Sequence, residues 1–303
     1  MNIWNQWLSD FRIYLENVLN SPENTIIAYT RDCVQFIDFI EKYYPCVYKT
    51  GDISEVEAKA FKDKLEEKGY KKITCARKLD SLRKFGEFLK NGGLRKGVNP
   101  FYRIPYPKPE RDRIDYLTIK EIDILLSMDF RNDFIGLRDN ALLELFYRTG
   151  FRLSELANLK RHEVKLKDGL ILICKKKDEI RKFPGGPKTF EAVTKYLEAR
   201  KKKIPSSRIK SRNNTFFLNN SGYTITPRSI ARIVSKYLKE VAERQKLSTH
   251  SLRSSFTTHL LDAGLTIKRV QSILRHKDCM ITYKYKWYKK NYENKKSNKN
   301  KSN

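Results

Sequence analysis

The chain has no long hydrophobic run and few cysteines. No segment of its 303 residues approaches the ~18 apolar residues that a membrane-spanning helix needs, and the N-terminus shows no signal-peptide pattern. We therefore expect a cytoplasmic protein with no membrane partner. The five cysteines are odd in number and scattered without a C-x-x-C pair, which argues against a disulfide framework or a zinc site.

The sequence also lacks the motifs of nucleotide-dependent and metal-dependent enzymes. It contains no P-loop, no Asp/Glu cluster suited to Mg²⁺ and no internal repeat. We therefore expect any chemistry to proceed without a cofactor, a bound metal or ATP.

Negative charge is scarce relative to positive charge. Lysine and arginine total 63 against 35 aspartate and glutamate, which gives a net charge of +28. A lysine-rich, solvated surface accounts for part of this excess, but solubility needs much less. The imbalance therefore predicts a polyanionic partner. DNA or RNA fits better than a membrane surface, because no basic amphipathic helix stands out.

The first part of the chain, residues 1–98, is expected to form four helices, because apolar residues recur there at helical spacing. Ser21 is the expected N-cap of the second helix, with Pro22 as its first helical residue. Ser54 and Glu57 have the spacing of a capping box that would open the third helix.

Proline is concentrated after this helical part. Four of the ten prolines fall between Pro100 and Pro109. Because proline donates no backbone hydrogen bond and resists helix formation, we expect an extended linker over residues 99–115. A second domain would then span residues 116–290, and the Lys/Asn/Ser-rich tail of residues 291–303 is expected to be disordered.

The second domain is predicted to be mainly helical with a small β-sheet. Residues 164–166, 170–173 and 180–183 have the composition of three consecutive strands. Helix signals dominate elsewhere: one helix is expected to stop at Gly150, and another to open at Pro227. The expected fold class is therefore mainly α with a small β-sheet (α+β).

Side chains suited to phosphate chemistry occur in a fixed order in the C-terminal half. The sequence contains Thr149-Gly-Phe-Arg152-Leu-Ser-Glu155-Leu, then His250-Ser-Leu-Arg253, then His276 and Tyr285. Arginine matches the charge of a phosphate, histidine can move protons, and tyrosine can act as a nucleophile. On a strongly basic protein, the phosphate is expected to belong to a nucleic acid.

This order and spacing resemble the tyrosine recombinase (phage integrase) family, and in particular its compact bacterial members, the Xer recombinases. The resemblance extends from about Leu8 to about Tyr288. It implies an N-terminal four-helix, SAM-like core-binding domain and a C-terminal catalytic domain. The implied activity is site-specific cutting and rejoining of duplex DNA through a 3′-phosphotyrosyl intermediate.

The resemblance also implies a role for each motif residue. Tyr285 would be the nucleophile, Arg152 and Arg253 would stabilise the transition state with His276, His250 could accept the tyrosine proton, and Glu155 would support the site. A lone arginine is more often structural, and an ordinary ion pair on a helix surface is an equally good interpretation of Glu155.

The family uses a hairpin lysine between its second and third strands as a general acid. We assign this role to Lys177, which precedes the expected turn at Asp178 and Glu179, with Lys176 and Lys175 as the other candidates. The alternative is a basic hairpin that only contacts backbone phosphates.

The sequence departs from the family pattern just before His276. Arg275 stands where the family usually has glycine, and a side chain makes a positive φ angle costly there. Arg275 would also add a cation close to the proposed phosphate.

Other tyrosines and histidines compete for these roles. The competing tyrosines are Tyr283, Tyr288 and Tyr292, and the family spacing selects Tyr285 over them. We expect His259 to pack on an apolar helix and His162 to be exposed.

The leading hypothesis is a Xer-like recombinase that resolves chromosome dimers. An integrase of a mobile element would have the same motifs, a catalytically inactive DNA-binding relative would keep only the fold, and the charge alone would also suit an RNA-binding protein. The partners implied are a duplex recombination site, a homo- or hetero-tetramer of protomers on paired sites, and a DNA translocase.

Overall fold

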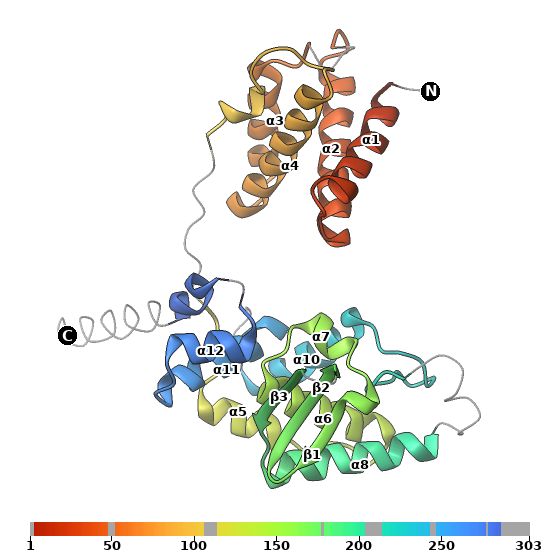
Figure 1. Ribbon diagram of the computed structural model, residues 1–303, viewed down its shortest axis with the longest axis vertical. Coiled ribbons are helices and arrows are strands. Elements are labelled where there is room, and N and C mark those ends of the chain that lie inside the picture. Colours follow the sequence, from red (N-terminus) through yellow and green to blue (C-terminus); the bar gives the residue numbers. More distant parts are fainter. Residues whose placement is uncertain are drawn as a thin grey trace, which may run out of the picture. The chain divides into compact units, whose positions relative to one another are not determined.

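The chain divides into two compact units, residues 1–112 and 113–303 (Figure 1). The computed structural model describes seven ranges: residues 3–47, 52–105, 114–176, 179–203, 214–242, 247–276 and 278–285. Within these ranges, no helix combines the length and the apolar character that a membrane crossing requires. The predicted tail, residues 291–303, lies outside the described residues.

The described part of the first unit contains the four helices that the sequence predicts. They are α1 (Ile3–Asn17), α2 (Glu23–Tyr43), α3 (Glu55–Glu67) and α4 (Lys72–Asn91). Their apolar faces meet in one core, in which Phe36 packs edge-on against Phe61 and Phe11 packs edge-on against Phe85. The helical periodicity of the sequence therefore identifies the buried faces of this unit.

The helix starts of this unit agree with the sequence at one predicted cap and differ at another. The predicted capping box opens α3: the Ser54 hydroxyl accepts from Val56, and Glu57 accepts from the Ser54 backbone N–H at 2.8 Å. The prediction for α2 was wrong by one residue. Pro22, with ψ of 144°, is the N-cap itself, because its extended backbone precedes the first helical residue and its carbonyl accepts the first helical bonds.

The start of the expected linker instead belongs to the first unit. Pro100–Tyr102 forms a short 3₁₀ helix, η2, which Asn99 caps by accepting from the Phe101 N–H at 3.1 Å. Phe101 and Ile104 are buried in the core of this unit. The prediction of an extended linker from residue 99 was wrong for this stretch, because two apolar anchors between the prolines bury on the helices.

The second unit contains the predicted three-stranded sheet. Strands β1 (Val164–Lys167), β2 (Leu170–Lys176) and β3 (Glu179–Pro184) are antiparallel in the order β1-β2-β3. Asp168 and Gly169, both with positive φ, turn the chain between β1 and β2. Strand β3 contacts α6, so the sheet lies against the helical core.

The helices of the second unit surround a core that includes most of α6. In chain order they are α5 (Ile119–Leu126), α6 (Phe134–Thr149), α7 (Leu153–Ala157), η3 (Arg161–Glu163), α8 (Pro187–Lys203), α10 (Pro227–Val241), α11 (Thr249–Asp262) and α12 (Ile267–Leu274). Figure 1 shows α11 and α12 next to each other, and α11 also contacts α6. Helix α10 opens at Pro227, as the sequence predicts, and α11 opens after its N-cap Ser248.

Gly150 makes the turn that leads into the first site motif. It ends α6 in the left-handed region with φ of 56°, as predicted. A β-carbon at this position would lie 2.4 Å from the ring of Phe256 and 2.8 Å from Leu274. Only glycine fits, because both the backbone angle and the close packing exclude a side chain.

Candidate active site

Arg152 is the N-cap residue of α7, directly after the Gly150 turn. The helix begins at Leu153. The Arg152 N–H donates to Glu155 Oε2 at 2.7 Å, and its Nη2 donates to the Arg275 carbonyl at 3.3 Å. The side chain is 45% exposed, so this guanidinium remains accessible to a ligand.

Arg253 is buried on α11 and connects three segments. Its Nη1 donates to the Gly150 carbonyl, and its Nη2 donates to the Leu274 carbonyl at 2.9 Å. Glu155 Oε2 lies 3.8 Å from Nη1. Burial, followed by the positive charge of Arg152, lowers the pKa of Arg253. Two of its donors are thus used to hold the backbone around the site.

His250 lies in the first turn of α11, one helical turn before Arg253. Desolvation of the ring, with the Arg253 charge as a second cause, lowers the pKa of His250 from its usual 6.5. The imidazole is therefore neutral at pH 7 and can accept a proton.

His276 is buried directly after α12. Its Nδ1 is 2.8 Å from the Thr282 hydroxyl, which is itself fully buried. Burial and the charges of Arg253 and Arg152 lower the pKa of His276 to about 4. This histidine is therefore neutral at physiological pH and is held in a fixed orientation.

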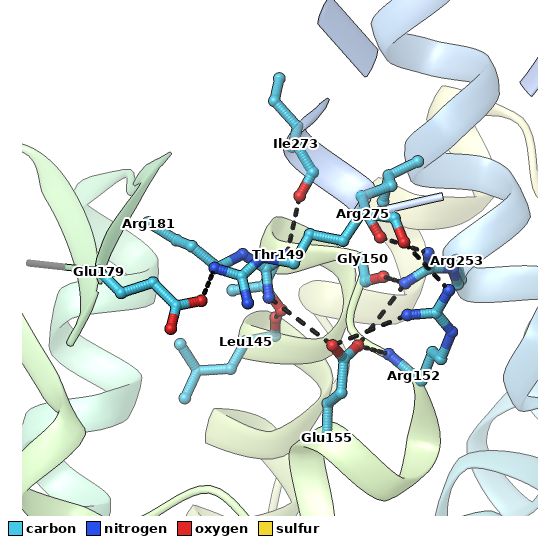
Figure 2. A network of polar contacts seen from close by, with 11 residues as sticks. Leu145, Thr149, Gly150, Arg152, Glu155, Glu179, Arg181, Arg253, Ile273 and Arg275 are labelled. Atoms are coloured by element: carbon cyan, nitrogen blue, oxygen red, sulfur yellow. Dashed lines mark hydrogen bonds and ion pairs between the residues drawn. The ribbon is translucent and has the colours of Figure 1, made fainter. Parts of the chain in front are cut away.

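Arg275 keeps the backbone turn that glycine would allow. It caps α12 in the left-handed region, with φ of 51° and ψ of 49°. Its guanidinium pairs with Glu179 of β3 (Figure 2), and it does not line the cleft described below. The expectation of an additional cation beside the phosphate was therefore wrong, because a carboxylate on the neighbouring strand attracts the side chain.

Tyr285 is the last described residue of a helical segment that begins at residue 279, and it is only 6% exposed. Tyr283 is 48% exposed. Tyr288 and Tyr292 lie outside the described residues. Of Tyr283 and Tyr285, only Tyr285 lines the cleft that is described below.

One cleft brings together five of the predicted site residues. It is lined by Arg152, His250, Arg253, His276 and Tyr285, together with Phe146, Phe151, Leu153, Thr249 and Ile281. These five side chains come from α7, α11, the turn after α12 and the segment that follows. The arrangement combines cations, two neutral imidazoles and a phenol, the groups that a phosphoryl transfer to tyrosine requires.

Glu155 lies at the centre of an arginine cluster (Figure 2). Its Oε1 is 3.8 Å from Arg152 and 3.9 Å from Arg181, and its Oε2 is 3.8 Å from Arg253. An ordinary ion pair on a helix surface does not describe this contact. One carboxylate is shared by three guanidinium groups, so the cluster retains excess positive charge.

Arg181 is a site residue that was not predicted from the sequence. It lies on β3, where alternate residues are buried, and it shares the inward face with Phe183. The two-residue alternation of the strand could have identified Arg181 from the sequence. An arginine on the inward face of a strand is buried and therefore requires a specific partner. The predicted site residues of this hairpin were all lysines.

The hairpin lysine is the predicted site residue that is not located. Lys177 and Asp178 lie outside the described residues. Lys175 is exposed on β2, and the side chain of Lys176 is not described. The assignment of the general acid stays a prediction.

The two remaining histidines are where the sequence places them. His259 is half-buried on α11, with its Nδ1 2.9 Å from the Tyr147 hydroxyl, which confirms a packing role. His162 is exposed and contacts the Asn214 side chain.

Comparison with known proteins agrees with this architecture. Residues 115–293 match the phage integrase family, and residues 8–93 match the phage integrase N-terminal SAM-like domain. A helical SAM-like domain followed by an integrase domain defines the class of tyrosine recombinases. The chain belongs to the phage integrase family.

The chain is similar to Xer proteins over most of their length. Tyrosine recombinase XerC of Syntrophus aciditrophicus is 34% identical over 284 residues, covering 92% of this chain and 91% of the relative. Tyrosine recombinase XerD of Listeria innocua is 32% identical over 285 residues and 93% of both chains. The resemblance to Xer-like tyrosine recombinases is confirmed.

Solved structures share the fold. XerH recombinase bound to palindromic difH substrate has a TM-score of 0.73 at 18% identity, covering 96% of this chain and 84% of that one. The Tn1549 transposon integrase bound to circular intermediate DNA has a TM-score of 0.70 at 20% identity, covering 92% and 94%. These neighbours support the predicted mainly helical fold with a small sheet.

Proposed function

We propose that this protein is a Xer-like site-specific recombinase that cuts and rejoins duplex DNA through a 3′-phosphotyrosyl intermediate. The observation that carries the proposal is the single cleft that gathers Arg152, His250, Arg253, His276 and Tyr285. The family membership and the 34% identity to a XerC protein support the same assignment.

In the proposed cleavage step, the Tyr285 oxygen attacks the scissile phosphorus and forms a phosphotyrosyl bond. The bond from phosphorus to the 5′ oxygen breaks, which leaves a free 5′ hydroxyl. Arg152 and Arg253 stabilise the negative charge that develops on the non-bridging oxygens. Because the phosphodiester energy is kept in the protein–DNA bond, a 5′ hydroxyl from a second duplex can reverse the step.

Proton transfers accompany both bond changes. His250 accepts the proton of Tyr285, a role that its lowered pKa supports because the ring is neutral before attack. Lys177 donates a proton to the departing 5′ oxygen, with Lys176 and Lys175 as the alternatives. His276, neutral and fixed by Thr282, supports the phosphate beside Arg253.

We propose that this reaction requires neither a metal ion nor ATP. The excess positive charge of the arginine cluster around Glu155 supplies the electrostatic stabilisation that a metal ion gives in other nucleases.

The proposed setting is a tetramer of protomers on two paired recombination sites. Within this setting, we propose that the protein resolves chromosome dimers in the cytoplasm, with a second recombinase and a DNA translocase as partners. The relatives named tyrosine recombinase XerC and XerD support the recombinase part of this proposal. The solved XerH complex with difH and the integrase complexes with transposon DNA support a duplex DNA substrate.

Covalent trapping tests this function. Wild-type protein, Tyr285→Phe and Tyr283→Phe are incubated with nicked duplexes carrying candidate sites, in the presence of EDTA, and SDS-stable protein–DNA adducts are measured. Tyr283 provides a matched control, because it is a neighbouring but exposed tyrosine. We expect adducts with the wild type and Tyr283→Phe and none with Tyr285→Phe.

Two results would contradict the proposal. Specific DNA binding by the wild type without any adduct would favour a catalytically inactive DNA-binding relative. An adduct that persists in Tyr285→Phe would assign the nucleophile to another residue.

A further inference from the structure

The C-terminal end of α12 is held by three arginines. Arg181 Nη2 donates to the Ile273 carbonyl at 2.8 Å, Arg253 Nη2 to the Leu274 carbonyl at 2.9 Å, and Arg152 Nη2 to the Arg275 carbonyl at 3.3 Å (Figure 2). The last carbonyls of a helix lack helical donors and carry partial negative charge, so they attract cations. Three consecutive carbonyls therefore set the spacing of three guanidinium groups.

Arg181 differs from the other two arginines because it does not line the cleft. Its guanidinium is buried beside the rings of Phe151 and Phe183, with ring centroids 4.7 Å and 4.9 Å away. A buried cation is costly unless its partners compensate for lost hydration. Its charged partner in the cluster is Glu155, at 3.9 Å from Nη1.

Arg181 and Arg152 share one oxygen of that carboxylate. Glu155 Oε1 lies 3.8 Å from Arg152 Nη1 and 3.9 Å from Arg181 Nη1. Both distances exceed that of a direct charge-assisted hydrogen bond, so neither guanidinium fully engages this oxygen. Without Arg181, a positive charge would no longer offset the attraction of Oε1 for Arg152, and the carboxylate would draw Arg152 away from a phosphate.

We propose that Arg181 is a positioning residue that keeps Arg152 and Arg253 available to the scissile phosphate, through Glu155 and the end of α12. This inference rests on the proposed cleavage reaction and assigns a further residue to it. Arg181 itself does not touch the phosphate.

The test compares Arg181→Met and Arg181→Lys with Arg200→Met. Methionine keeps an apolar side chain against the rings of Phe151 and Phe183 and removes the charge. Arg200 is a matched control, since it is also a buried arginine of the second unit and donates to a backbone carbonyl, that of Thr215, at 3.0 Å. Adduct formation at saturating DNA, DNA affinity and unfolding free energy are measured for the full-length protein.

We expect Arg181→Met to slow adduct formation about 10²-fold, the scale expected when a catalytic group is misplaced by ~1 Å. DNA affinity should stay close to that of the wild type. Arg181→Lys should restore part of the rate, because an ammonium group can still engage Glu155. Arg200→Met should lose comparable stability and keep its rate. Equal rate losses in Arg181→Met and Arg200→Met, or an unchanged rate in Arg181→Met, would overturn the proposal.

A second measurement does not depend on cleavage. Guanidinium NMR signals of Arg152 and Arg253 in the free protein should shift and broaden in Arg181→Met and remain unchanged in Arg200→Met. If the wild type forms no adduct, the proposed function fails, and this comparison still decides whether Arg181 positions the two arginines. Unchanged signals would overturn the inference by themselves.

Discussion

The side chain of Arg275 forms an ion pair with Glu179 of strand β3. This pair connects the residue before His276 to strand β3. The backbone of Arg275 is left-handed at the same time, a conformation that costs a residue with a β-carbon about 1 kcal/mol or more. At this residue, the ion pair therefore stabilises the folded state, whereas the backbone strain destabilises it.

Two substitutions of Arg275 separate these effects. Arg275→Ala removes the ion pair and keeps the strain, whereas Arg275→Gly removes both. We expect the glycine variant to be about 1 kcal/mol more stable than the alanine variant, because only glycine adopts this φ without penalty. Chemical denaturation measures the difference. An alanine variant as stable as the glycine variant would show that the turn is unstrained.

Gly150 should tolerate no side chain. Gly150→Ala places a β-carbon against Phe256 and Leu274 and also strains the backbone, so we expect a loss of about 3 kcal/mol in unfolding free energy. Gly264→Ala is the matched control, since Gly264 also has positive φ but nothing lies within 4 Å of its added β-carbon. The control should lose only about 1 kcal/mol. Calorimetry compares the two, and equal losses would exclude the packing argument.

His276 should remain neutral in mild acid. Its folded pKa of about 4 lies below the usual 6.5, so the unfolded chain takes up the proton first. The free energy of unfolding should therefore decrease as the pH falls from about 6.5 towards about 4, and this contribution is fully present above pH 6.5.

An NMR titration of the four histidine rings checks this directly, with His276→Gln to assign the signal. In Thr282→Val, the Nδ1 atom of His276 loses its hydroxyl partner, and the ring signal should change. Titration of His276 at or above pH 6.5 would contradict the predicted neutral state.

Arg253→Lys should lose both activity and stability. A single ammonium group cannot reproduce the bonds to the carbonyls of Gly150 and Leu274 while facing Glu155. One buried carbonyl left without its donor costs about 1–3 kcal/mol. We expect adduct formation to fall by about 10²-fold or more, as for the loss of one transition-state donor. Trapping assays at saturating DNA measure the rate, and a rate within about threefold of wild type would show that charge alone suffices.

The same trapping assay with Arg148→Lys provides a control. Arg148 is on α6, its side chain is 36% exposed, and it does not line the cleft. This variant should keep the wild-type rate, which would separate a specific loss at Arg253 from a general effect of replacing arginine with lysine.

Local signals in the sequence were sufficient for most of the secondary structure. Helical periodicity located α1 to α4, the capping box at Ser54 and Glu57 opened α3, and Gly150 ended α6. These features are set by neighbours within one or two turns, so they can be inferred from spacing alone. The linker prediction failed at Phe101 and Ile104, because proline content says nothing about which apolar residues find a core.

The sequence alone determined the helical and strand segments, the family and five residues that share a cleft, because ordered motifs and short-range periodicity record them. Only the tertiary structure revealed that Arg181 reaches Glu155 and that Arg275 turns to Glu179. These contacts join β3 to α7 and to the end of α12, segments far apart in the chain. Long-range packing decides which carboxylate or carbonyl a long cationic side chain meets, and no local pattern encodes that choice.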